Sequence, residues 1–223
     1  MTQKLSKSLF KKKKNHAFTL VEMMFVLVIF GIIGIGLTAL MINSSRDMLW
    51  SVNKSLITND FRQFTGQISQ DSLNASHAFL YPSFDQGVVS NPNNRRDQGL
   101  SGDCLVLVST TPIPDINSQR FFERIVVYYR QPGNTPNRPV FRRERVFPNP
   151  TIPTTTTIET LLTTEISNFG PAEQVLELSR GLSEDQLFYR ATNEAFLING
   201  EIIHGANRQR VTNTYNLTIS TRG

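Results

Sequence analysis

A single acidic side chain, Glu22, stands where a block of positive charge meets a long uncharged segment. The lysines Lys11–Lys14 precede it, and the 23 residues Met23–Ser45 that follow carry no charged side chain. A carboxylate in an apolar environment is costly, and its attraction to a cation is stronger there than in water. A carboxylate at the rim of an apolar helix therefore needs a physical reason. One interpretation is that Glu22 only reaches interfacial water.

The uncharged segment has the length of a membrane span. As a helix, Met23–Ser45 rises about 35 Å, which exceeds a hydrocarbon core of about 30 Å. The apolar part of a cleaved secretory signal is shorter, about 7–15 residues. Because lysines precede the span, the positive-inside rule predicts a cytoplasmic N-terminus, with everything after Ser45 outside.

The positive net charge belongs to the first residues and not to the rest of the chain. The whole sequence has 23 basic and 18 acidic residues, and six of the basic residues but no acidic residue precede Ala17. Residues 18–223 therefore hold 17 basic against 18 acidic residues, a net charge of −1. An interpretation as a nucleic-acid-binding protein from bulk charge loses most of its support.

The residues around Glu22 resemble a known processing signal. The run Ala17-Phe18-Thr19-Leu20-Val21-Glu22, followed by the apolar segment, is similar to that of type IV pilin-like proteins, which include type IV pilins, type II secretion pseudopilins and competence pilins. The resemblance implies that a prepilin peptidase cuts between Ala17 and Phe18 and methylates the new amine of Phe18. It also implies that Glu22 pairs with the Phe18 amine of a neighbouring subunit during assembly. Ala17 stands where the family normally has glycine, so slower cleavage is expected.

The resemblance also implies an organisation and a location. Residues 1–17 would be a cytoplasmic basic leader that is removed, 18–45 the transmembrane and assembly helix, and 46–223 an extracytoplasmic pilin-like domain. The chain would cross the inner membrane once, with its C-terminal domain in the periplasm, and then enter a pilus or pseudopilus. The implied partners are the prepilin peptidase, other pilin or pseudopilin subunits and the inner-membrane assembly platform.

The helix is predicted to continue beyond the membrane, from about Thr19 to about Leu73. Trp50, Ile57, Phe61, Phe64 and Ile68 recur at spacings of 7, 4, 3 and 4, which places them on one helical face. Such a face needs an apolar surface to cover, so we expect these side chains to be buried.

Later segments supply that surface. They are rich in β-branched and aromatic residues, and 121–147 resembles an antiparallel hairpin with a long loop at 131–137. A short helix is expected at Thr160–Ser167. The fold class is therefore α+β, with a long N-terminal helix packed on an antiparallel sheet. The predicted strands are Cys104–Ser109, Arg124–Tyr129, Val140–Phe147, Leu187–Tyr189, Ala195–Ile203 with a turn near Asn199-Gly200, and Val211–Thr221.

One dense basic group lies outside the leader. Arg142, Arg143 and Arg145 fall on a predicted strand, and alternation places Arg143 and Arg145 on the face of Phe141 and Phe147. One interpretation is contact with DNA or a partner protein. The other is a strand rim whose arginines bond to Glu144 or other acids.

The sequence offers no catalytic or metal-binding constellation. None of the three histidines lies near another, and the sequence lacks zinc, phosphate-loop and dinucleotide motifs. The lone cysteine, Cys104, lies in a predicted strand and is expected to be buried and inert. We therefore expect no enzyme activity, no cofactor and no metal.

The hypothesis that the sequence supports best is a structural minor subunit of a type IV pilus or a type II secretion pseudopilus. One alternative is a DNA-binding uptake pilin, which depends on the three arginines. Another is a signal-anchored periplasmic protein of other function.

Overall fold

The computed structural model describes residues 19–112, 119–131, 133, 138–149, 151–177, 179–204 and 211–222. The chain divides into two compact units, Met1–Asp47 and Met48–Gly223. Helix α1, Leu20–Leu73, has residues in both units. The predicted helix over 19–73 is confirmed.

The first unit contains the apolar part of α1. Every residue from 20 to 47 is exposed in the single chain. Within the described residues, α1 is the one helix whose length and composition are sufficient to cross a membrane, and an 18-residue window in it has a mean hydropathy of 2.8.

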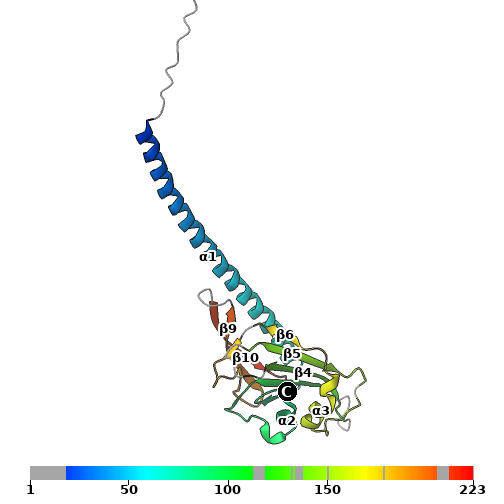
Figure 1. Ribbon diagram of the computed structural model, residues 1–223. Coiled ribbons are helices and arrows are strands. Elements are labelled where there is room, and N and C mark those ends of the chain that lie inside the picture. Colours follow the sequence, from blue (N-terminus) through cyan, green and yellow to red (C-terminus); the bar gives the residue numbers. More distant parts are fainter. Residues whose placement is uncertain are drawn as a thin grey trace, which may run out of the picture. The chain divides into compact units, whose positions relative to one another are not determined.

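The second unit is built on two antiparallel sheets (Figure 1). We call them sheet A, with strand order β1-β3-β4-β5-β6, and sheet B, with order β10-β9-β8-β2 and β7 paired to β9. The strands of sheet A are β1 (His77–Tyr81), β3 (Cys104–Thr110), β4 (Phe122–Arg130), β5 (Val140–Val146) and β6 (Glu173–Leu176). Those of sheet B are β2 (Ser101–Gly102), β7 (Ser179–Gly181), β8 (Phe188–Arg190), β9 (Ala195–His204) and β10 (Val211–Ser220).

Short helices complete the second unit. They are α2 (Gln86–Val89), α3 (Ile158–Glu165), and the 3-10 turns η1 (Pro92–Asn94) and η2 (Ile166–Asn168). The predicted short helix at 160–167 therefore exists as α3 and η2. The predicted hairpin is also confirmed, since β4 pairs antiparallel with β5; most of its loop lies outside the described residues.

Alternation along the central strands gives sheet A two buried faces. On β3, Leu105 and Leu107 point into one core, whereas Val106 and Val108 point into the other. The first core holds the second half of α1 and the apolar face of sheet B. The second holds Val89 of α2 and the apolar face of α3, which cover the opposite face of sheet A (Figure 1).

The outer half of α1 packs between the two sheets in the first core. Ile57, Phe64 and Ile68 are fully buried, and the ring of Phe64 meets Tyr128 of sheet A and Tyr215 of sheet B edge-on. The expectation that Trp50 shares this burial is wrong, because Trp50 is 52% exposed. It lies near the start of the second unit, and the ammonium group of Lys54 lies over its ring, 5.0 Å from the ring centroid.

The strand predictions hold for β3, β4, β5, β8, β9 and β10 within two residues, but the turn predicted at Asn199-Gly200 is wrong. Strand β9 is continuous from 195 to 204, and Gly200 pairs with Tyr215. A Cβ atom at Gly200 would lie 3.0 Å from Tyr215 Oη and 2.8 Å from Leu187 Cδ1. Glycine is therefore present for close packing and not for a turn. Strands β1, β2, β6 and β7 were not predicted.

Candidate functional site

The start of α1 is the first candidate site. Ala17 and Phe18, the predicted cleavage and methylation positions, lie outside the described residues. The structure begins at Thr19, directly before the first helical residue, Leu20, and Glu22 lies in the first turn of the helix.

Thr19 and Glu22 form a reciprocal pair of backbone caps. The backbone N–H of Thr19 donates to Glu22 Oε2 at 2.8 Å, and the backbone N–H of Glu22 donates to Thr19 Oγ1 at 3.3 Å. The Thr19 hydroxyl also donates to Glu22 Oε2 at 3.1 Å. This is a capping box, in which a threonine at the N-cap and a glutamate three residues later satisfy N–H groups that have no partner inside the helix.

The capping box offsets part of the free-energy cost of placing the Glu22 carboxylate beside an apolar segment. The carboxylate accepts two hydrogen bonds from Thr19 and lies at the positive end of the helix dipole. It also remains exposed, so a cation from another molecule has access to it. Sequence reasoning did not assign a role to Thr19, although the spacing Thr-x-x-Glu before an apolar run is a recognised sign of a helix start.

Polar side chains farther along the apolar segment bond within the helix. Thr38 Oγ1 donates to the carbonyl of Gly34, and Ser45 Oγ donates to the carbonyl of Met41, both at 2.8 Å. Because these hydroxyls are satisfied one turn back, they add little polarity to the outer face of the helix.

Arg142, on β5, faces α1 and belongs to a partly buried ionic cluster around the buried Asp71. Its Nε donates to Asp71 Oδ2 at 2.9 Å and its Nη2 donates to Glu144 Oε2 at 2.7 Å. Asp71 also accepts from Arg124 Nη2 at 2.7 Å and from Tyr128 Oη at 2.6 Å. Burial alone would raise the pKa of Asp71, but the hydrogen bonds from Arg142 and Tyr128 and the two guanidinium charges hold it below its usual value.

Arg143 and Arg145 point to the opposite face of sheet A. Arg143 donates to the carbonyls of Gly170 and Phe169, at 3.0 and 3.3 Å. Arg145 Nε donates to Glu165 Oε2 at 3.2 Å, and its guanidinium lies over the ring of Phe147.

The three arginines therefore do not form one patch, because alternation along β5 divides them between two faces. All three are half-buried and bond to other groups of the chain. Arg142 bonds to Asp71 and Glu144 and Arg145 bonds to Glu165, whereas Arg143 bonds to backbone carbonyls and not to an acid. Contact of these arginines with DNA or a partner stays a prediction, and their bonding gives it no support.

Comparison with known proteins bears on the start of the chain. Residues 12–38 match the family model described as the prokaryotic N-terminal methylation motif. No curated protein and no solved structure matches the chain.

The described fold and the match to the methylation-motif model together define a class of protein. The molecule joins an apolar N-terminal helix, suited to membrane anchoring, to an α+β unit with two antiparallel sheets. It carries a type IV pilin-like prepilin signal, and this motif implies processing by prepilin peptidase and assembly of pilin-like subunits into filaments.

Proposed function

We propose that this protein is a structural minor subunit of a type IV pilus or a type II secretion pseudopilus, without enzyme activity. The observation that carries the proposal is the position of the methylation motif, residues 12–38, which ends inside the exposed apolar half of α1. A length of 223 residues and a single cysteine favour a minor subunit over a major one. In this proposal the C-terminal unit is periplasmic before assembly.

The proposed assembly step is an exchange of partners by Glu22. Before assembly its carboxylate is held by Thr19 of the same chain. In the filament, the methylated Phe18 amine of a neighbouring subunit approaches the exposed carboxylate, and the low dielectric of the membrane strengthens their attraction. This pairing selects the depth at which one helix docks beside the next.

Mass spectrometry of the N-terminus tests the processing step. Protein isolated from cells that express the whole assembly system should begin at an N-methylated Phe18. Steady-state protein that still begins at Met1 would contradict the proposal and favour a plain membrane anchor.

Two substitutions of Glu22 test the assembly step. Glutamine also completes a capping box but carries no charge, whereas valine loses both properties. We expect Glu22→Gln and Glu22→Val to insert into the membrane normally and to be absent from sheared filaments. Normal incorporation of Glu22→Gln would show that the charge of Glu22 is not used in assembly.

A further inference from the structure

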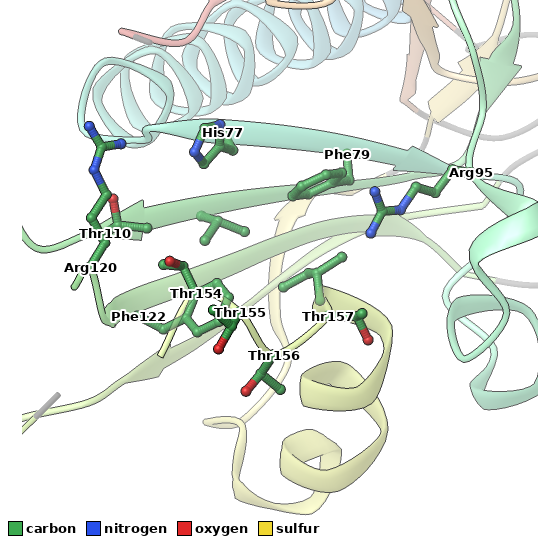
Figure 2. A pocket seen from close by; sticks show the side chains of 12 residues that line it. His77, Phe79, Arg95, Thr110, Arg120, Phe122, Thr154, Thr155, Thr156 and Thr157 are labelled. Atoms are coloured by element: carbon green, nitrogen blue, oxygen red, sulfur yellow. The ribbon is translucent and has the colours of Figure 1, made fainter. Parts of the chain in front are cut away.

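A groove crosses the face of sheet A that also carries α3. Its volume is about 450 Å³, and it runs between strand β1, at the edge of the sheet, and the threonine segment that leads into α3 (Figure 2). Figure 2 shows Arg95 and Arg120 at opposite ends, with Phe79 and the threonines between them. We call this the basic groove; its lining is His77, Phe79, Arg95, Val108, Thr110, Arg120, Phe122, Thr154, Thr155, Thr156, Thr157 and Ile158.

A second cavity continues the basic groove past Arg120. It also measures about 450 Å³, and it shares Thr110 and Arg120 with the first. Arg222 adds another guanidinium to its lining, and its backbone is held by a hydrogen bond from its N–H to the carbonyl of Ala75. The two cavities together form an elongated depression, which suits an extended chain better than a compact molecule.

The charged side chains among the described lining residues are basic. Arg95, Arg120 and Arg222 line the two cavities together with His77, and no aspartate or glutamate is found among the described residues of either lining. Residues 18–223 as a whole carry a net charge of −1. The basic side chains along the two cavities therefore give this surface a charge that differs from that of the rest of the chain. Neither Arg120 nor Arg222, both exposed, forms an ion pair with any other described residue.

Arg95 differs from the other two arginines because it is already fixed. Its Nη2 donates to Glu159 Oε2 at 2.8 Å, and Glu159 also accepts from Tyr81 Oη at 2.7 Å. This holds the guanidinium of Arg95 4.5 Å from the ring centroid of Phe79. The face of the Phe79 ring that Arg95 covers is therefore not available for stacking a nucleic-acid base.

We propose that the basic groove and the cavity beside it bind an extended acidic segment of a partner protein. The carboxylates of the segment would pair with Arg120 and Arg222. An apolar side chain of the segment would lie against Phe79, Val108 and Phe122. The threonine hydroxyls of the groove would form hydrogen bonds with the backbone of the segment. The argument for an acidic peptide is charge complementarity, together with the elongated form and the covered aromatic ring.

Fluorescence anisotropy with a defined probe tests this proposal. The probe is a fluorescein-labelled ten-residue peptide that alternates glutamate with valine, titrated onto the full chain in nanodiscs of zwitterionic lipid at 50 mM salt. Arg120→Gln/Arg222→Gln should weaken binding about tenfold, because each exposed ion pair contributes modestly. The control is Arg62→Gln/Arg180→Gln, which removes the same charge from exposed positions elsewhere and should change the affinity less than twofold.

The leader lysines are the same in all of these proteins, so their effect cancels in the comparison. No binding to the unchanged protein would overturn the proposal, as would an equal loss in the control pair. A single-stranded oligonucleotide that binds as tightly and is weakened by the same groove substitutions would assign the surface to nucleic acid instead.

A fluorophore placed in the groove provides an independent readout. The native cysteine, Cys104, is fully buried, so Thr155→Cys gives one accessible attachment site in the lining, and Asn216→Cys on β10 gives a matched exposed site outside it. The peptide should change the emission at position 155 and not at position 216. Equal changes at both positions would contradict binding in the groove.

Discussion

The carboxylate of Asp103 accepts a hydrogen bond from the backbone N–H of Leu187, with Oδ1 and N 3.0 Å apart. Asp103 lies between β2 of sheet B and β3 of sheet A, where the chain passes from one sheet to the other. Its second oxygen, Oδ2, lies 3.2 Å from Arg130 Nη2 and 3.3 Å from Arg138 Nη2. One side chain thus joins the segment before β8 to the end of the β4–β5 hairpin.

The position of Asp103 predicts a specific dependence of stability on pH. Burial raises its pKa to about 6, although the Leu187 N–H and Arg138 act in the opposite direction. The folded state therefore binds this proton more tightly than the unfolded state, in which an aspartate titrates near pH 4. The contribution of Asp103 to the free energy of unfolding is fully present below about pH 4 and is lost as the pH rises through about 6, by about 3 kcal/mol at most.

Urea titrations of the full chain in detergent micelles check this between pH 4 and 7. Asp103→Asn should remove the dependence, so the stability difference from the unchanged protein should vary with pH. Asp85→Asn, at an exposed carboxylate that makes no side-chain cap bond, is the matched control substitution. A pH-independent difference for Asp103→Asn would contradict the raised pKa.

Asp71 predicts a pH dependence of stability with the opposite sign, at lower pH: the free energy of unfolding falls as the pH falls. Its pKa is held below the usual value, as is that of Glu144, because hydrogen bonds and charges from Arg142 and Arg124 outweigh burial. The stability that these carboxylates contribute is present above their ordinary pKa values, near 4, and is lost as the pH falls through their lower folded values. We expect Asp71→Asn to flatten the loss of stability on acidification below about pH 4, measured by circular dichroism. An unchanged slope would exclude this role.

Removal of the Asp71 charge at neutral pH should be strongly destabilising. The side chain is 5% exposed and bonds to three side chains of sheet A, so Asp71→Asn leaves two half-buried guanidinium groups without a full partner. We expect a loss of about 3 kcal/mol in the free energy of unfolding. Glu123→Gln, at an exposed carboxylate of β4, should change it by less than about 0.5 kcal/mol.

A double-mutant cycle tests whether Arg142 is an interaction partner of Asp71. Asp71→Asn combined with Arg142→Gln should cost less than the sum of the single losses, because the second change removes a charge that the first left unpaired. Strictly additive losses would mean that the two groups do not interact.

The sequence predicts the elements of this fold better than their arrangement. Spacings of 3 and 4 along α1 correctly predict burial of Ile57, Phe64 and Ile68, and the apolar run around Val106 correctly predicts a strand. Both signals are local. Trp50 fits the same periodicity but is exposed, because burial also requires a surface opposite the helix, and periodicity carries no information about where that surface begins.

The partners of charged residues are the part that the sequence did not reveal. The arginines of β5 are adjacent in sequence, yet Arg142 bonds to Asp71, 71 positions away, while Arg145 bonds to Glu165. The alternation of the strand determines the face to which each arginine points. The carboxylate that lies on that face is determined by the packing of α1 and α3. At the N-terminus, by contrast, Thr19 and Glu22 are three residues apart, so the sequence alone is sufficient to predict that they pair.

Thr19 therefore gives a prediction about the start of the membrane helix. Thr19→Val keeps the shape of the side chain but removes the oxygen that accepts the N–H of Glu22. We expect the first turn to lose about 1 kcal/mol of stability, and the amides of residues 20–23 to exchange faster in micelles. Thr19→Ser keeps the cap and should exchange at the original rate; equal exchange in both variants would show that the cap is not formed.

Gly102 gives a final prediction at the crossing between the sheets. A Cβ atom on this residue would overlap the backbone carbonyl oxygen of Tyr81 and would press against Leu80. Because the obstacle includes backbone of the neighbouring segment, relief requires a shift of β1 or β2, and Gly102→Ala should lower the free energy of unfolding by about 1–3 kcal/mol. The matched change is Gly66→Ala on α1, where a Cβ meets nothing within 4 Å; alanine favours the helix there and should raise stability by up to about 1 kcal/mol. Thermal unfolding of the two variants in the same micelles should move in opposite directions, and a stabilising effect of Gly102→Ala would contradict the tight crossing.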